Sequence, residues 1–160
     1  MIELLVTAVS FLSAAAFAAV WGAHVFETIV MFRVWAADPA TELPAFVASP
    51  YMAKGAAFWR TLAPGLWFIS LIAVIAAGVA GVQTHLALVI AGACGLIHMA
   101  MVMLIFLPTN VKLGFYSGAP VSLDPQAIKT LVLQWGRWNL VRVGLEAVGL
   151  VAALFAFKAS

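Results

Sequence analysis

Four long runs of apolar residues follow one another along the chain, separated by short polar or proline-containing stretches. They cover residues 2–35, 56–82, 86–107 and 126–157. A helix needs roughly 20 apolar residues to cross a bilayer, so each run is long enough to do so. Backbone polar groups in lipid must bond within their own segment, which favours helices. The pattern therefore predicts an all-α integral membrane protein, an antiparallel four-helix bundle that forms a single domain over residues 1–160.

Proline and short polar stretches mark the predicted connections. Residues 36–55 contain Pro39, Pro44 and Pro50, which we expect to break any regular helix there. Residues 83–85 are expected to form a tight connection between the second and third helices. Pro108 is expected to end the third helix, and residues 109–125 to form a second loop. The fourth run is longer than a bilayer requires, so its first turns should project beyond the hydrocarbon.

The composition agrees with a membrane protein. Hydrophobic residues make up 66% of the chain and charged residues only 9%, whereas soluble proteins have about half apolar and about a quarter charged residues. The mean hydropathy is +1.13. So little polar surface excludes a cytosolic enzyme or a nucleic-acid-binding module. The single cysteine, Cys94, cannot form an internal disulfide, and we interpret it as a small packing residue.

Basic residues predict the orientation of the bundle. Most of them fall on or near the two longer loops: Arg33, Lys54, Arg60, Lys112, Lys129 and Arg137. The opposite side has only Lys158. Because loops rich in Lys and Arg stay in the cytoplasm, both longer loops should be cytoplasmic and both termini outside. The first run has no basic residue before Arg33, so we expect a retained helix there rather than a cleaved signal peptide.

Small residues are frequent on the second and third runs, among them Gly78, Gly81, Gly92 and Gly95. In lipid, close packing rather than the hydrophobic effect drives the association of helices, and small residues let two backbones approach. We therefore expect a compact bundle.

Ionisable and polar side chains lie within the apolar runs: His24, Glu27, His98, Asn139, Arg142 and Glu146. An ionisable group in the hydrocarbon costs roughly 3 kcal/mol on insertion scales and usually marks a functional site. At 1.5 Å per residue, His24 and His98 should both lie roughly 13–15 Å from the same cytoplasmic boundary. The sequence thus predicts a polar site in the cytoplasmic half of the bundle.

The spacing of these residues also predicts pairs within a helix. Glu27 follows His24 by one turn, and Glu146 follows Arg142 by one turn, so each pair shares a helix face. Both pairs have a purely structural interpretation, in which His24 and Glu27 form a hydrogen-bonded clasp and Arg142 and Glu146 an internal salt bridge. Their clustering at one depth favours a site. His85 lies in a short connection, where we expect it to be solvated.

Aromatic residues gather near the same end of the bundle: Trp35, Phe58, Trp59, Trp135 and Trp138. Aromatic belts are usual at membrane interfaces. The alternative is the wall of a pocket for an apolar, aromatic substrate that enters from the membrane.

The order of several short motifs resembles the anthrone oxygenase-like family of small four-span membrane proteins. The motifs are Gly22-x-x-x-Phe26-Glu27, Trp35, Pro50-Tyr51, Phe58-Trp59-Arg60, Pro108-Thr109-Asn110 and Trp135-x-x-x-Asn139-x-x-Arg142. The resemblance covers nearly the full length. Characterised members, from fungal polyketide pathways, oxidise an anthrone to an anthraquinone with molecular oxygen and no established cofactor. Most members are bacterial, which implies the inner membrane of a bacterium. By position, the resemblance implicates Glu27, Asn110, Trp135, Asn139 and Arg142.

The leading hypothesis is a membrane-embedded, oxygen-dependent oxidase or monooxygenase that acts on an apolar, electron-rich aromatic or quinol-like molecule. His24 or His98 would be the base, with Glu27 orienting the imidazole. Arg142, held by Glu146, would stabilise the developing oxyanion. The expected substrate contacts are Trp59, Arg60, Asn110, Trp135 and Asn139. The expected partners are the lipid bilayer, the substrate and molecular oxygen, with no nucleic acid, and a homo-oligomer stays open.

Two further hypotheses remain. In the first, His24, Glu27 and His98 bind a non-haem metal, with Glu146 as a fourth ligand, because two imidazoles and a carboxylate match the ligand set of non-haem iron; in a variant, His24 and His98 are axial ligands of a haem. In the second, the protein is a non-catalytic carrier of a small molecule or an accessory membrane subunit, since buried Arg–Glu pairs also serve transport. No inverted repeat is visible in the sequence, so a carrier would require oligomers.

Overall fold

The computed structural model describes residues 2–81, 85–117 and 124–159, and every regular element in them is helical. The elements are α1 (Ile2–Phe26), η1 (Glu27–Met31), α2 (Phe32–Ala37), α3 (Pro39–Val47), α4 (Pro50–Ala80), α5 (Leu86–Met101), η2 (Val102–Phe106), α6 (Leu107–Lys112) and α7 (Pro125–Ala159). The η segments are π-helical turns that continue their neighbours without a break. Most of the predicted connection at residues 83–85 and part of the predicted loop lie outside the described residues.

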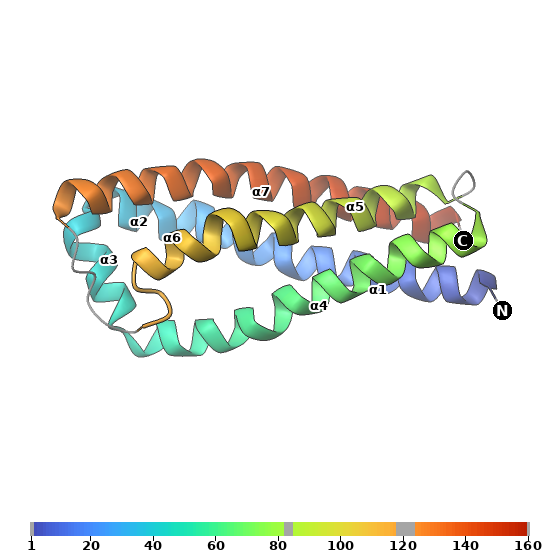
Figure 1. Ribbon diagram of the computed structural model, residues 1–160, viewed down its shortest axis with the longest axis horizontal. Coiled ribbons are helices and arrows are strands. Elements are labelled where there is room, and N and C mark those ends of the chain that lie inside the picture. Colours follow the sequence, from blue (N-terminus) through green and yellow to red (C-terminus); the bar gives the residue numbers. More distant parts are fainter. Residues whose placement is uncertain (1, 82–84, 118–123, 160) are drawn as a thin grey trace.

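In the described part of the chain, four helical stretches are long and apolar enough to cross a membrane. They are Ile2–Ala37, Ala57–Ala80, Leu86–Lys112 and Pro125–Ala159. Figure 1 shows them side by side and alternating in direction, with the two termini at one end of the bundle and α3 at the other. The prediction of an antiparallel four-helix membrane bundle is confirmed.

The prediction that residues 36–55 contain no regular helix is wrong. Helix α3 begins at Pro39 and α4 begins at Pro50, six residues before the predicted start of the second run. Proline is tolerated in the first turn of a helix because that turn lacks partners for its N–H groups in any case. Pro44 lies inside α3, but Leu43 and Val47 on the same short helix are 0% and 2% exposed. Burial of these side chains stabilises α3 despite the proline.

The prediction that Pro108 ends the third helix is also wrong, because the helix continues through Pro108 to Lys112. A proline ring clashes with the carbonyl group four residues earlier, here that of Leu104. Leu104 lies in η2, where the turn is wider than in an α-helix. Such local π adjustments let helices in membranes accept proline.

Glycines set the close approach of the helices in the half of the bundle that holds the termini. Gly92 and Gly95 of α5 face Ser70 and Val74 of α4, and Gly149 of α7 faces the ring of Phe17 on α1. A Cβ atom at any of these three glycines would overlap the facing residue. The expected role of small residues is therefore confirmed at Gly92 and Gly95. Gly78 has open space around it.

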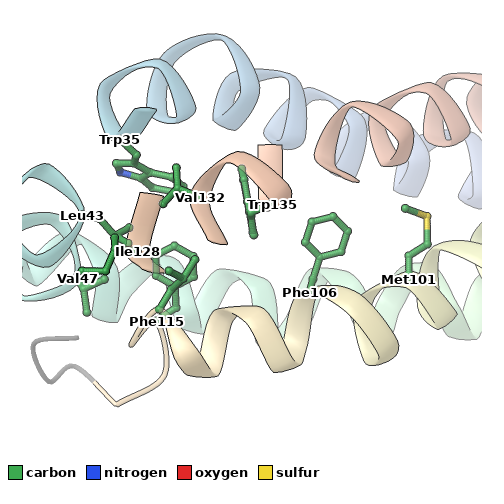
Figure 2. Packing of buried hydrophobic residues seen from close by; sticks show 10 residues of the cluster. Trp35, Leu43, Val47, Met101, Phe106, Phe115, Ile128, Val132 and Trp135 are labelled. Atoms are coloured by element: carbon green, nitrogen blue, oxygen red, sulfur yellow. The ribbon is translucent and has the colours of Figure 1, made fainter. Parts of the chain in front are cut away.

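The opposite half of the bundle contains larger side chains. A hydrophobic cluster there joins α2, α3, α7 and the end of the third span, and we call it the loop-end cluster: Trp35, Leu43, Val47, Met101, Phe106, Leu113, Phe115, Ile128, Val132 and Trp135 (Figure 2). The Trp35 ring centroid lies 5.4 Å from that of Phe115 and 5.5 Å from that of Trp135. Large side chains such as these aromatic rings do not allow the close backbone contact that glycine does.

Helix α4 helps to open this half. Figure 1 shows that the first half of α4 bows away from α6, whereas its second half runs close to α5. Pro64 lies inside α4 and removes one N–H group from the helix ladder. Bends in long helices usually have such a cause.

Candidate functional site

Three buried side chains from three helices meet at one level of the bundle. His24 Nδ1 of α1 lies 2.7 Å from Glu146 Oε1 of α7, and His98 Nε2 of α5 lies 3.2 Å from the same oxygen. The exposed fractions of His24, His98 and Glu146 are 2%, 0% and 0%. The two imidazole centroids are 5.7 Å apart, so the two histidines lie side by side. We call these three residues the His–Glu cluster.

Arg142 lies on α7 one turn before Glu146 and pairs with a different carboxylate. Its Nη2 lies 3.3 Å from Glu27 Oε2 and also donates to Asn139 Oδ1. The guanidinium carbon lies 3.9 Å from the ring centroid of Phe106, within the range of a cation–π interaction. Both acidic groups therefore find their basic partner on another helix, and the predicted pairs within a helix are replaced by His24–Glu146 and Glu27–Arg142.

The π-helical turn η1 places Glu27 and Thr28 beside α7. Thr28 Oγ1 donates to the carbonyl oxygen of His24 at 2.7 Å, and Asn139 Nδ2 donates to Thr28 Oγ1 at 2.6 Å. The bond from Asn139 to Thr28, together with the Glu27–Arg142 pair, ties the wide turn to α7. Turns of this type occur often at functional sites.

Two tryptophans of α4 cover the histidines. The Trp59 ring is stacked on the His24 ring, with centroids 4.5 Å apart and an interplanar angle of 6°. Trp67 Nε1 donates to His98 Nδ1 at 3.3 Å. Further toward the loops, Trp135 Nε1 donates to Asn110 Oδ1 at 3.1 Å. The rings thus fix the imidazoles on the side that faces α4.

A cavity of about 300 Å³ lies between α4 and the third span and ends on the two histidines. Small-molecule sites range from about 300 to 1,000 Å³. Apolar and aromatic side chains form most of its lining, including Trp59, Trp67, Val102, Phe106, Phe115 and Trp135. Its charged and polar lining is His24, Glu27, Arg60, His98, Asn110 and Arg142. Such a space suits a flat apolar molecule that carries one or two polar atoms.

The candidate residues are divided by this geometry. Those that line the cavity are His24, Glu27, Trp59, Arg60, His98, Asn110, Trp135 and Arg142. In the described part of the chain, Asn139 and Glu146 do not line the cavity. Both lie on α7, where Asn139 accepts a hydrogen bond from Arg142 and Glu146 is hydrogen-bonded to His24.

The aromatic residues fall into two groups. Trp59 and Trp135 line the cavity, as the pocket interpretation requires. Trp35 is buried in the loop-end cluster. Phe58 and Trp138 are 48% and 38% exposed, as an interfacial belt requires.

Sequence reasoning missed Trp67, which contacts His98, and Phe106, which lies under Arg142. For Trp67 a signal existed, because positions 59, 63 and 67 share one face of a helix. Phe106 is the last residue of η2, whose wide turn shifts the helix face in a way that an α-helical pattern does not predict.

The geometry does not suit a haem between the two histidines. One carboxylate oxygen of Glu146 contacts both imidazoles, at 2.7 and 3.2 Å. The two rings therefore converge on a single atom instead of facing the two sides of a flat macrocycle.

The fold and the site define a class, namely small integral membrane proteins with a polar cavity inside a four-helix bundle. Within this class, the profile of the anthrone oxygenase family matches residues 52–152, and the chain belongs to that family. The matched range includes His98, Arg142 and Glu146, whereas His24 and Glu27 precede it. Comparisons with the curated proteins and with the solved structures find no match.

Proposed function

We propose that the protein uses molecular oxygen to oxidise an apolar, electron-rich aromatic or quinol-like molecule inside the bundle. One observation carries this proposal: the cavity has aromatic walls and ends on buried histidines beside an arginine. Membership of the anthrone oxygenase family supports the same class of reaction.

The lining of the cavity also supports entry of the substrate from the membrane. Met103 lines the cavity, is 51% exposed and lies in η2, inside the third membrane span. That side of the cavity therefore faces the hydrocarbon. Arg60 and the 46% exposed Tyr116 line the cavity nearer the loops. An apolar substrate dissolved in the bilayer would enter beside Met103 and turn its polar atoms toward Arg60 or Arg142.

The proposed reaction starts from a methylene group between aromatic rings. The His–Glu cluster accepts one proton from it, and Arg142 stabilises the negative charge that spreads onto the substrate oxygen. The carbanion adds oxygen to give a peroxide anion, which takes back the proton from the His–Glu cluster, and the resulting hydroperoxide loses water and leaves a ketone. The sum is R₂CH₂ + O₂ → R₂CO + H₂O, so oxygen is the only oxidant and all atoms balance.

Anthrone is a suitable probe for a direct test. The protein in detergent should consume oxygen when anthrone is added and release anthraquinone, both beyond the uncatalysed rate. His24→Ala and His98→Ala should each lower kcat/KM by roughly 10²–10⁴, the usual contribution of a general base. The measurement is oxygen uptake together with product analysis.

His85→Ala is the matched control, because His85 lies before α5 at the end of the bundle that holds the termini. Its turnover should equal that of the unaltered protein. The proposal fails if His24→Ala, His98→Ala and Arg142→Ala all keep full turnover of a substrate that the protein accepts.

We further propose that the loop end of the bundle faces the cytoplasm of a bacterium. The basic residues of the two longer loops all belong to this end, and Lys158 belongs to the other. This distribution agrees with the positive-inside rule. The termini would then lie in the periplasm.

Cysteine labelling tests the orientation. In a Cys94→Ala background, a cysteine at the exposed Ala159 should react with an impermeant maleimide in intact inner-membrane spheroplasts. A cysteine at the exposed Thr130 should react only after the membrane is permeabilised. The reverse result would overturn the proposed orientation.

A further inference from the structure

We infer that the His–Glu cluster binds one divalent transition-metal ion, with His24 Nδ1, His98 Nε2 and a carboxylate oxygen of Glu146 as ligands. The three ligand atoms all lie within 4.8 Å of one another. Two ligands at about 2.1 Å from an ion in tetrahedral geometry lie roughly 3.4 Å apart. The N···O separation of 3.2 Å at His98 is close to that spacing, whereas the 2.7 Å separation at His24 is a hydrogen-bond distance that would lengthen when an ion binds.

Unpartnered atoms support a missing ligand. Glu146 Oε2 is buried and has no hydrogen-bond partner, and His98 Nε2, which lies 3.2 Å from Glu146 Oε1, makes no well-aligned hydrogen bond. Both residues are 0% exposed. Buried polar atoms without partners are rare and call for an explanation. A metal ion at the centre of the cluster would bind both side chains.

The charge of the site favours a cation. The site contains two carboxyl groups, those of Glu27 and Glu146, and one basic group, that of Arg142. Because Arg142 pairs with Glu27, an ionised Glu146 would be left with the two histidines as its partners, at a depth where burial of charge is costly. A divalent cation bound by Glu146 compensates this charge.

The chemistry of the donors indicates which ion. Two imidazoles and one carboxylate, with positions left open, are the ligand set of non-haem Fe(II) sites, and a similar set binds catalytic zinc. His24 and His98 line the cavity, so open positions on the ion would face it. The sequence had suggested Glu27 as the carboxylate ligand, but Glu27 pairs with Arg142 and Glu146 takes its place.

Trp67 provides a test of the ligand atom. A metal on Nε2 of a neutral imidazole requires the proton on Nδ1, so Nδ1 can no longer accept the hydrogen bond of Trp67. That bond is long, at 3.3 Å. The hydrogen bond from Trp67 favours the tautomer with the proton on Nε2, which cannot bind a metal there. Removal of the indole N–H should therefore favour metal binding.

Ion binding goes beyond the proposed function and is measured without substrate. A bound ion would use the ring nitrogens that face Glu146, so the metal-free and metal-bound forms would differ in the group that takes the substrate proton. Turnover of metal-stripped and metal-loaded protein shows which form is active. Absence of metal binding would overturn this inference without affecting the proposed oxidation, and absence of oxidation would leave the binding measurement valid.

The experiment loads purified, metal-stripped protein with Fe(II) without oxygen, and in parallel with Co(II). Elemental analysis should find one ion per chain, and Co(II) should quench the fluorescence of Trp59 and Trp67. The apparent melting temperature should rise with metal concentration, since a ligand that binds only the folded state stabilises it. This last measurement needs no variant.

The variants locate the ion. His24→Ala, His98→Ala and Glu146→Gln should each lose it, whereas Glu27→Gln and His85→Ala should keep it. Trp67→Phe should bind at least as tightly as the unaltered protein. The inference is overturned if the unaltered protein binds no more metal than Glu146→Gln, or if Glu27→Gln loses the ion while Glu146→Gln keeps it.

Discussion

Arg142→Ala is expected to abolish most of the activity and to destabilise the bundle. Arg142 is 5% exposed and faces Glu27 at 3.3 Å. Removal of one partner of a buried ion pair costs roughly 3–5 kcal/mol in the free energy of unfolding, because the other charge stays buried and unpaired. Loss of a group that stabilises an oxyanion lowers kcat by on the order of 10²–10³. Thermal unfolding in detergent and oxygen uptake with anthrone measure the two effects.

A double variant separates the two roles. Glu27→Gln combined with Arg142→Met removes both charges of the pair, and such replacements are often neutral for stability. We expect the double variant to recover most of the lost melting temperature but none of the lost kcat. Recovery of kcat as well would show that Arg142 acts only through the stability of the bundle.

Gly95→Ala is expected to have the second large effect, through packing. A Cβ atom at Gly95 would overlap Ser70 Oγ and approach Ser70 Cβ to 2.6 Å. Extra volume in a closely packed interior costs about 1–3 kcal/mol. The change also reaches the site, since Ser70 and Gly95 lie one turn from Trp67 and His98. A lower melting temperature and a lower kcat/KM should therefore appear together.

Two controls accompany this variant. Gly78→Ala should leave the melting temperature unchanged or raise it, because nothing lies within 4 Å of a Cβ atom at that position and alanine has the higher helix propensity. Ser70→Gly combined with Gly95→Ala removes the overlapping atoms and should restore the melting temperature. Equal destabilisation by Gly95→Ala and Gly78→Ala would contradict the role of the contact between α4 and α5, because helix propensity favours alanine at both positions.

Much of the fold could be predicted because the bilayer imposes a simple rule of length and hydropathy on each span. The four spans follow from that rule. The helix α3 could not be predicted, since prolines break helices only where the missing N–H group and the ring clash matter. At Pro39 and Pro50 they do not, because both prolines begin a helix.

The site could be predicted in depth but not in pairing. Counting residues along a helix gives the level of His24 and His98, which lie side by side. It does not give the rotation of one helix against another, which decides the partner of each carboxylate. Because of that rotation, Glu146 pairs with His24 and Glu27 pairs with Arg142, instead of each carboxylate pairing within its own helix. Trp67 was missed because a tryptophan on an apolar helix is usually core or interface.

The two π-helical turns divide the first and third spans into parts with different angular phase. Each wide turn adds a residue, and one residue corresponds to about 100° of rotation in an α-helix. The α-helical spacing of inward-facing positions therefore does not continue from α1 into α2, nor from α5 into α6. The close-packed half and the half with the cavity each keep their own inward face. Deletion of one residue within η1 would thus leave α1 in place and turn Trp35 away from Trp135.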